Sequence, residues 1–293
     1  LNPLDGLKKN NNIRQIIWKI RAKKVILATG SIERPLTFDN NDRPGIMLAN
    51  SASKFLNYYG VKLAKEMVVF TNNDSAYQTA IDFNNKGIKV KAIIDVRSYH
   101  ESTIIKKAEL LGIKIFYQHA VTNTSGRLRI KSVKINKIDD LIKKIIGNPI
   151  EIQCDFLCIS GGWTPTVHLF TQSRGKLIYR ENDGTFIPHQ SFQNTISVGS
   201  CNGTFYLKEI LDETFIKIKE GLKSFEKNIN FDQKYKSKTN NINPHKNTWS
   251  IPSSKHFGKT KMFIDLQNDV TSKDIKVALR EGFQSIEHVK RYT

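Results

Sequence analysis

The sequence predicts an α/β fold built on parallel strands, followed by a small helical module at the C-terminal end. A short apolar run leading into small residues and glycine occurs three times, at residues 25–31, 154–162 and 195–203. Residues 67–95 have the pattern of a strand, a helix and a second strand. This is the β-α-β unit of a nucleotide-binding half domain. Together the two observations favour a chain built from nucleotide-binding units.

The net charge and the apolar runs of the sequence bear on whether the protein binds nucleic acid or a membrane. The 293 residues include 46 Lys and Arg and 27 Asp and Glu, giving a formal net charge of +19. Such a balance is typical of proteins that bind nucleic acid or a membrane surface. Here, however, the lysines are spread along the chain and accompany abundant Asn and Ile, which is the codon bias of an AT-rich genome. No apolar run reaches 18 residues. We therefore expect no nucleic acid and no membrane among the partners.

The three cysteines favour a reducing compartment, and we expect a cytoplasmic location. Cys154 and Cys158 are separated by three residues, so they do not form a CxxC pair, and Cys201 stands alone. No second pair completes a metal site. We interpret them as small buried hydrophobic residues and predict no metal site.

Residues 1–48 are predicted to be the C-terminal part of a first dinucleotide-binding domain. A half-exposed strand is expected at residues 14–20 and a short buried strand at residues 25–27. The small residues 28–30 then let the backbone pass close to a flat or anionic group, because Gly30 can take a positive φ. An ordinary exit from strand to loop is the alternative. The first strand of such a domain, with its glycine-rich turn, is expected to lie upstream of Leu1.

Residues 49–160 are predicted to form a second, degenerate nucleotide-binding domain. Helices are expected at residues 49–59, 75–85 and 101–111, and parallel strands at residues 67–70, 90–95 and 113–117. Two further strands at residues 128–135 and 150–153 fit a β-meander. A basic helix or loop is expected between them, at residues 137–148. A lone histidine, His119, is expected to be a surface or hydrogen-bonded residue.

The turn at residues 71–76 is anomalous because it contains no glycine. A pyrophosphate usually reaches the start of the following helix over glycines. Asp74 would repel a phosphate as well. We therefore expect this unit to keep its architecture and to have lost pyrophosphate binding at the turn. The alternative is that Asn72 and Asn73 take positive φ angles and still bind a nucleotide.

Residues 161–226 are predicted to return to the first domain. A turn is expected at residues 163–166, a third apolar strand ends at Gly199, and an amphipathic helix follows at residues 207–226. Residues 227–258 have the composition of a linker or arm, which Trp249 and Ile251 could anchor on the first domain. Residues 259–293 form the small module, with a helix capped by Thr271 (or Ser272) that ends near Glu281 and a second helix at residues 286–292.

Five separated motifs, in the same order, resemble the alpha subunit of heterotetrameric, tetrahydrofolate-dependent sarcosine oxidase. They are Leu27-Ala28-Thr29-Gly30 with Glu33-Arg34-Pro35; residues 41–48; residues 69–77; residues 160–169; and residues 263–271 with 287–293. The glycine-free turn is part of that family's pattern. The resemblance covers most of the chain, which is expected to be an internal fragment of the longer subunit.

The resemblance implies a two-dinucleotide-binding-domain flavoprotein-like fold, of the FAD/NAD(P)-binding, pyridine nucleotide-disulfide oxidoreductase-like type, incomplete here. It implies an oxidoreductase subunit of a complex that oxidatively demethylates sarcosine to glycine, with hydrogen peroxide and methylene-tetrahydrofolate as further products. NAD is expected in the first domain and FMN at the interface with the beta subunit. The beta, gamma and delta subunits are the expected partners. Two alternatives stay open: a related proline, opine or glycine dehydrogenase or oxidase, and a non-catalytic docking module for the flavin subunit.

The resemblance also suggests where the cofactors lie. The residues expected to face NAD are Ala28, Thr29, Gly30, Gly199, Ser200, Phe205 and Leu207. The alternative is that these positions serve the fold without touching a ligand. Lys255, Lys259 and Lys261 could neutralise an FMN phosphate, although we favour the interpretation that they are solvated surface lysines. No nucleophile–base pair is evident, so no catalytic residue is predicted in this chain.

The last module resembles a small ferredoxin-like module of related amine dehydrogenases, in which cysteines hold an iron–sulfur cluster. In this sequence Asp265, Gln267 and Asp269 occupy that region, and no cysteine follows Cys201. Because thiolate ligands are missing, we expect no iron–sulfur cluster. The module is expected to be structural or part of the flavin-side interface.

Overall fold

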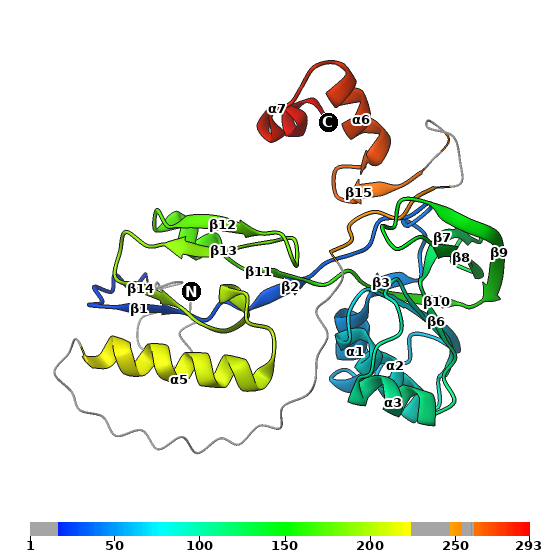
Figure 1. Cartoon of the computed structure of the whole chain (residues 1–293), viewed down its shortest axis with the longest axis horizontal. Coiled ribbons are helices and arrows are strands. Elements are labelled where there is room, and N and C mark those ends of the chain that lie inside the picture. Colours follow the sequence, from blue (N-terminus) through cyan, green and yellow to red (C-terminus); the bar gives the residue numbers. More distant parts are fainter. Residues whose placement is uncertain (1–16, 224–246, 254–258, 260) are drawn as a thin grey trace, which may run out of the picture.

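The computed structural model describes residues 17–223, 247–253, 259 and 261–293 (Figure 1). Two α/β units lie side by side, and a small C-terminal module lies above them in this view. Two short segments pass between the units, β2 (Ser31–Glu33) and β11 (Trp163–Pro165). They pair antiparallel, with Glu33 opposite Trp163 and Ser31 opposite Pro165. The segment expected as a plain turn at residues 163–166 is therefore partly a strand, because it pairs with the other connection.

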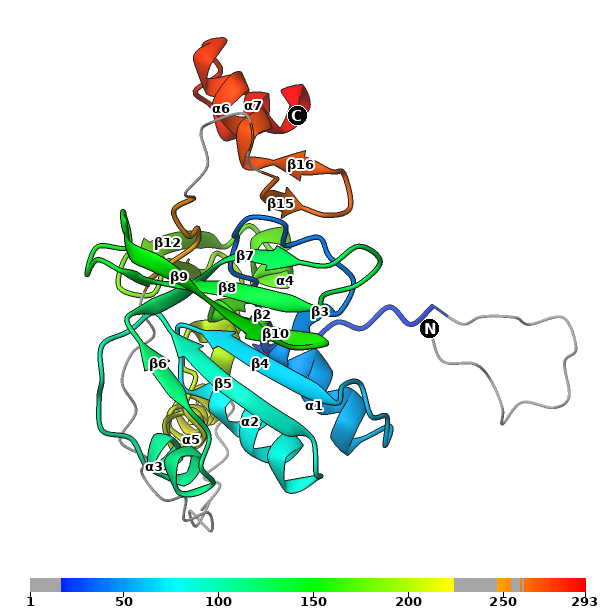
Figure 2. The same ribbon diagram turned by 90° about the vertical axis from the view of Figure 1, so that its right-hand side faces the viewer.

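The larger unit is built on a five-stranded parallel sheet in the order β3-β10-β4-β5-β6. The strands are β3 (Ile46–Leu48), β4 (Glu66–Thr71), β5 (Lys89–Asp95), β6 (Ile115–Tyr117) and β10 (Phe156–Ser160). The helices α1 (Ala49–Asn57), α2 (Ser75–Asn85) and α3 (Thr103–Leu110) cover one face. The meander β7 (His119–Ser125), β8 (Ser132–Ile138) and β9 (Ile145–Gln153) covers the other (Figure 2).

Each face of this sheet packs into a separate hydrophobic core. The helix side buries Met67, Tyr77 and Phe83, and the meander side buries Phe38 and Phe70, whose rings meet edge to face at 5.7 Å. Ile251 lies 1% exposed in the meander-side core. The expected anchoring of the arm by Ile251 is thus confirmed, but it occurs on the larger unit rather than on the first domain. Cys154 and Cys158 are buried here, as predicted, and Cys201 is buried in the other unit.

The prediction of a basic helix or loop at residues 137–148 is wrong for most of this stretch. Here β8 continues to Ile138 and β9 begins at Ile145, so the region is mostly strand. The composition of this stretch suits a helix, but the Asp139 carboxylate accepts the backbone amides of Lys143 and Lys144 at 2.7 and 2.6 Å. Ile142 also takes a φ of 55°. These contacts close a tight turn between two strands of the meander. The strand β7, which begins at His119, was not predicted.

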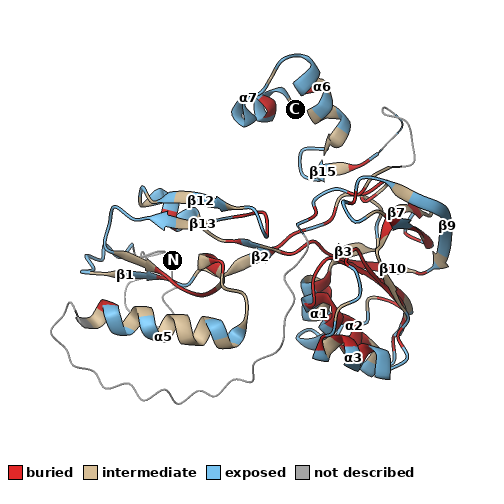
Figure 3. Cartoon of the chain, viewed as in Figure 1, coloured by how far each residue is buried: buried red, intermediate tan, exposed pale blue. Residues whose placement is uncertain are grey.

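The smaller unit contains the parallel pair β1 (Val25–Leu27) and β14 (Thr195–Ser197). The hairpin β12 (Lys176–Arg180) and β13 (Thr185–Gln190) lies on one side of this pair and α5 (Leu207–Lys223) on the other (Figure 1). The unpredicted hairpin follows the short helix α4 (His168–Gln172). Much of α5 is half-buried or exposed, whereas the larger unit is buried through its centre (Figure 3).

Two predictions for the smaller unit fail. The strand at residues 25–27 was expected to be buried, but Val25 is 42% and Ile26 46% exposed, and only Leu27 is buried. The physical reason is that β1 pairs with β14 alone in the described part of the chain. Of the strand expected at residues 14–20, residues 14–16 lie outside the described residues, and residues 17–20 are exposed and irregular. Nothing described here pairs with them.

The C-terminal module follows its prediction closely. The strands β15 (Phe263–Asp265) and β16 (Val270–Thr271) pair antiparallel, and the helices α6 (Ser272–Arg280) and α7 (Ile286–Tyr292) follow. Thr271 caps α6 through a reciprocal capping box with Asp274. Gly282, at a φ of 95°, lies just past its end. No helix in the described ranges has both the length and the apolar character to cross a membrane.

Candidate functional site

The strands β1 and β14 end at the same edge of the smaller unit. Their parallel register sets Leu27 opposite Ser197, and the Val198 amide donates to the Leu27 carbonyl at 3.0 Å. The segments 28–30 and 199–200 therefore leave the sheet next to each other. In open α/β sheets, ligands bind in the crevice beyond the carboxyl ends of parallel strands. The structure thus brings five of the seven predicted cofactor residues to one edge.

The turn after β1 is fixed by hydrogen bonds to Thr166, and space is open next to the Cα of Gly30. Gly30 has a φ of 75°, and no heavy atom lies within 4 Å of the position that a Cβ would take. Its carbonyl accepts the Thr166 amide at 2.9 Å, and the Thr29 hydroxyl donates to the Thr166 carbonyl at 2.6 Å. Residue 166 therefore fixes the turn while the Cα of Gly30 stays accessible. Such a turn allows a ligand to approach the backbone closely.

The turn after β14 is a 3-10 turn, η1 (Gly199–Asn202), that leads into α5. Gly199 has a φ of 73°, and a Cβ there would lie 3.3 Å from the Ile210 side chain. Of the remaining predicted residues, Phe205 is half-buried and Leu207 is 66% exposed at the first position of α5. These two residues follow the edge rather than forming it. Contact of all seven with NAD stays a prediction.

The lysines predicted for FMN differ in their surroundings. Lys255 lies outside the described residues, and Lys259 is exposed. The Lys261 ammonium forms an ion pair with Asp42 at 2.6 Å and lies 5.3 Å from the Phe263 ring centroid. This contact helps to fasten the C-terminal module to the larger unit. Lys261 would have to exchange that pair for a phosphate contact.

A pocket of about 440 Å³ lies beside α5 near the start of β14. Its walls include Lys24, Ile196, Lys217 and Gly221. None of the seven predicted cofactor residues lines it, and both lysines are engaged. Lys24 donates to the Gly221 carbonyl at 3.3 Å, and Lys217 donates to the Ser197 carbonyl at 3.0 Å. The pocket borders the candidate edge through Ser197 and Asn202 but does not include the residues predicted to face NAD.

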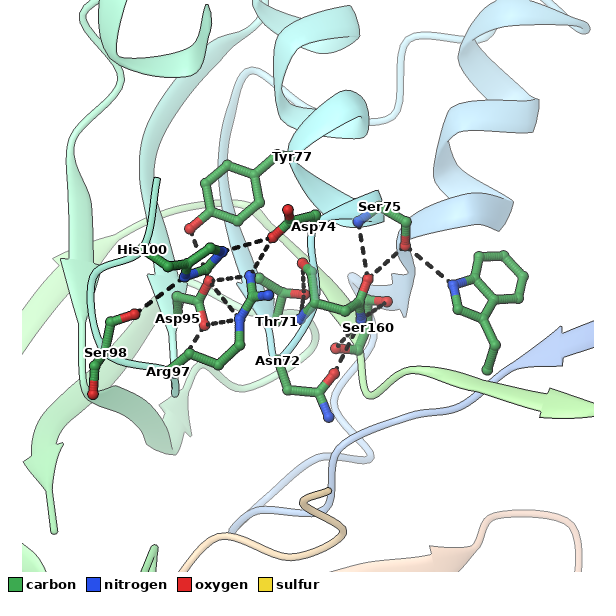
Figure 4. Close-up of polar contacts among 12 residues, drawn as sticks. Thr71, Asn72, Asp74, Ser75, Tyr77, Asp95, Arg97, Ser98, His100 and Ser160 are labelled. Atoms are coloured by element: carbon green, nitrogen blue, oxygen red, sulfur yellow. Dashed lines mark hydrogen bonds and ion pairs between the residues drawn. The ribbon is translucent and has the colours of Figure 1, made fainter. Parts of the chain in front are cut away.

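In the larger unit, side chains fill the glycine-free turn (Figure 4). The Asn73 carbonyl oxygen Oδ1 accepts the Ser75 amide at 3.0 Å, and its Nδ2 donates to the Ser160 hydroxyl at 2.9 Å. The side-chain amide Nδ2 of Asn72 donates to the Gly161 carbonyl at 3.1 Å. Both asparagines are buried, and neither has a positive φ. The alternative that depended on positive φ at these asparagines is therefore wrong.

A buried ionic cluster lies against the same turn (Figure 4). The Arg97 guanidinium bridges the carboxylates of Asp95 and Asp74, each at 2.7 Å from Nη2. The Tyr77 hydroxyl donates to Asp95 at 2.8 Å. His100 Nε2 lies 3.0 Å from Asp74, and its Nδ1 lies 3.2 Å from the Ser98 carbonyl.

Charge compensation explains how this cluster is tolerated. The Arg97 guanidinium faces two carboxylates, and His100 lies against one of them. Burial disfavours the charged form of Arg97, but Asp95 and Asp74 outweigh burial, so the pKa of Arg97 is raised. Burial, with the Asp95 carboxylate, raises the pKa of Tyr77 well above its ordinary value. The cluster therefore places a buried carboxylate that is paired with Arg97, that of Asp74, just before α2, where a phosphate would bind in a nucleotide-binding unit.

Sequence reasoning identified the missing glycines but not what replaces them. The sequence pattern predicts Asp95 only as the last residue of a strand, and it assigns no role to Arg97 or His100. The signal available was the spacing Asp95-Val96-Arg97, directly after β5. In a β-α-β unit this spacing brings both side chains to the ligand edge of the sheet.

The chain is similar to curated proteins over nearly its whole length. It is 34% identical over 300 residues to the sarcosine oxidase subunit alpha of Corynebacterium sp. (strain P-1) and 32% identical over 278 residues to that of Rhizobium meliloti (strain 1021). The alignments cover 99% and 94% of this chain but 30% and 26% of the relatives. The chain thus spans about a third or less of the length of these relatives. The resemblance seen in the motifs is confirmed.

A family profile and solved structures agree with this result. The profile described as "Sarcosine oxidase A3 domain" matches residues 259–293. The L-proline dehydrogenase of P. horikoshii superposes with a TM-score of 0.55 at 22% identity, covering 93% of this chain and 49% of that one. The thioredoxin reductase of T. acidophilum gives 0.51 at 17% identity, covering 70% and 66%. These two similarities show the fold alone, and they confirm the predicted α/β class.

Proposed function

Since this chain is similar along its whole length to sarcosine oxidase alpha subunits, we propose that it is the cofactor-binding part of such a subunit. In this proposal the complete complex oxidatively demethylates sarcosine to glycine and forms hydrogen peroxide and methylene-tetrahydrofolate. The beta, gamma and delta subunits are its partners, and the complex works in the cytoplasm. The observation that carries the proposal is the similarity over 99% of the chain.

We assign NAD to the edge formed by the ends of β1 and β14. Gly30 and Gly199 both have positive φ there, and Gly30 leaves its Cα side open. Such turns let phosphate and ribose oxygens approach backbone amides. The fit is therefore sterically reasonable, with Thr29 and Ser200 as the nearby hydroxyls. NAD when bound would supply a redox-active nicotinamide, and this chain's residues would hold and orient it.

FMN belongs, in the same proposal, to the interface with the beta subunit. The C-terminal module that matches the sarcosine oxidase A3 profile carries Lys259 and Lys261, and Lys261 already bridges to Asp42. We assign no catalytic residue to this chain. The chemistry at the substrate would then take place on the partner subunit, and this chain would act through binding and assembly.

A docking module without cofactor is the second candidate. The observation that favours it is the filled turn of the larger unit, where Asn73 and Asp74 occupy the start of α2. That unit keeps the nucleotide-binding architecture and stabilises it with its own side chains. If the smaller unit also bound no nucleotide, the chain would serve only as a docking module that binds the flavin-bearing subunit.

The two candidates can be separated with the full-length subunit. It is co-expressed with the neighbouring subunits, purified through a tag on one of them, extracted for NAD and FMN, and assayed for sarcosine-dependent peroxide. The proposal expects co-purification, bound NAD and peroxide formation with sarcosine. Co-purification without NAD, with peroxide formation unchanged in Gly30 and Ser200 variants, would support the docking module instead. Peroxide formation with proline but not sarcosine would contradict the assigned substrate.

A further inference from the structure

An exposed aromatic patch covers the C-terminal end of α1. We define it as Phe55, Tyr58, Tyr59 and Val61, which are 39%, 77%, 57% and 41% exposed. The Tyr58 and Tyr59 rings meet edge to face with centroids 4.9 Å apart, and Phe55 lies 5.7 Å from Tyr59. Three aromatic rings within five residues thus form one contiguous surface. Exposed apolar patches of this kind often mark interaction sites.

The patch is not an uncovered piece of the core. α1 buries Ala49, Ala52 and Leu56 against the larger unit, while Phe55 flanks this buried side and Tyr58 and Tyr59 lie in the turn just past the end of the helix. The sheet of this unit, its helices and its meander all lie within the described residues. Its two cores are closed on both faces of the sheet. Within the described part of the chain, the exposed rings thus belong to neither of these two cores.

The surroundings of the patch are basic. Residues 49–65 contain Lys54, Lys62 and Lys65 and no Asp or Glu. Two carboxylates approach from other elements, and both are engaged in hydrogen bonds. Asp82 accepts the side-chain amides of Asn57 and Gln78 at 3.0 and 2.7 Å, and Asp155 accepts the backbone amide of Lys65 at 3.0 Å. The lysines that flank the rings thus offer positive charge to a partner.

We propose that the aromatic patch docks on an acidic protein surface of another subunit of the same enzyme. Tyrosine and other aromatic residues supply most of the binding energy at protein interfaces, usually inside a polar rim. Complementary charge in that rim accelerates association and selects the partner. The overall charge of +19 makes an acidic partner the favourable one. An anionic membrane fits less well, since the nine-residue α1 keeps its apolar stripe in the core and has no second apolar face to insert.

The existence of other subunits rests on the proposed function, so the test separates the two. Full-length chain and separately purified partner subunits are titrated by sedimentation velocity. We expect the double variant Tyr58→Ala/Tyr59→Ala to weaken association at least tenfold. The matched control is Tyr99→Ala, a 62% exposed tyrosine whose ring packs on Tyr117, and it should change the affinity less than twofold. Circular dichroism checks that both variants keep the fold.

Charge is tested in the same assay. The variant Lys54→Glu/Lys62→Glu should weaken association several-fold at low salt, and the difference should shrink in about 1 M salt, where screening is strong. A photoreactive benzoylphenylalanine at position 58 should cross-link to a peptide of a partner subunit that is rich in Asp and Glu.

Three results would overturn the docking proposal. Normal association of the tyrosine variant would show that the patch is not an interface, while leaving the proposed function intact. Absence of any association of the unaltered chain would contradict both proposals. Loss of binding to phosphatidylserine vesicles in the tyrosine variant, with unchanged subunit association, would assign the patch to a membrane surface.

Discussion

The Arg34 guanidinium lies 4.1 Å from the ring centroid of Trp249. Beneath that ring it donates to the carbonyls of Gly161, Gly184 and Asp183 at 3.2, 2.9 and 3.0 Å. A single buried side chain therefore joins both segments that connect the units, the hairpin of the smaller unit and the segment 247–251. Burial lowers the pKa of Arg34, and the Asp183 charge opposes that effect.

Replacing Arg34 by Lys should destabilise the chain. A single ammonium cannot reproduce the planar fork of donors or its stacking on an indole ring, and buried carbonyls would lose their partners. We expect the free energy of unfolding to fall by about 2–4 kcal/mol in chemical denaturation. The control Arg127→Lys, at an exposed position, should change it by no more than about 0.5 kcal/mol. Equal values for the two variants would contradict the role assigned to Arg34.

For the ionic cluster at the glycine-free turn, we expect a substitution to lower the free energy of unfolding more than Arg34→Lys does. Asp95 is fully buried, so Arg97→Met would leave its carboxylate without its charged partner. Breaking one side of a buried pair costs about 3–5 kcal/mol, whereas neutralising both sides is far less costly. We therefore expect Arg97→Met/Asp95→Asn to be more stable than Arg97→Met alone, as measured by urea denaturation. A double variant less stable than the single one would refute charge compensation in this cluster.

Glu33 predicts a pH dependence of stability. It is 7% exposed, and its Oε2 accepts the Asn50 amide at the start of α1 at 2.8 Å. Burial raises the pKa of Glu33, and hydrogen bonds from Ser160 and Asn50 oppose this shift in part. A carboxyl with a raised folded-state pKa binds its proton more tightly in the folded chain. Its contribution to stability is therefore complete below the unfolded pKa of about 4.3 and is lost as the pH rises through the folded value.

The variant Glu33→Gln isolates this contribution. The difference in the free energy of unfolding between the two chains should change in favour of the variant as the pH rises from about 4 to 7. Urea denaturation at four pH values measures it. Glu101→Gln serves as a control, because Glu101 is 71% exposed in its side chain and pairs with Lys106 at the surface. A difference between wild type and Glu33→Gln that stays constant with pH would argue against a raised pKa for Glu33.

Local sequence patterns were enough to predict most of the larger unit. The spacing of apolar residues and the glycines after each helix gave α2 at residues 75–85 and β5 ending at Asp95. The return of residues 161–226 to the first domain was also predicted, whereas the direct pairing of β1 with β14 was not. What could not be predicted depends on side-chain hydrogen bonds in turns and on contacts between residues far apart in the sequence. The turn at Asp139 forms through side-chain acceptors, and the Arg34 network joins residues more than 120 positions apart.

The same limit applies to the candidate site. The residues Ala28 to Gly30 could be chosen from sequence, because small residues after a strand have a direct meaning in backbone geometry. The filling of the other turn could not, because Arg97 and His100 reach Asp74 across 23 and 26 positions. Only the three-dimensional fold shows that an ionic cluster of Asp74, Asp95, Arg97 and His100 lies against the turn that lacks glycines.

The central claim is that the nucleotide belongs to the end of β1. It is tested most directly by the NAD content of the purified full-length subunit carrying Gly30→Ala, compared with Gly87→Ala. Both glycines have positive φ, 75° and 73°, with no atom within 4 Å of the added Cβ, so both variants carry a similar backbone strain of about 1 kcal/mol. We expect at least a tenfold loss of bound NAD for Gly30→Ala and unchanged NAD for Gly87→Ala. Full NAD occupancy in Gly30→Ala would contradict it.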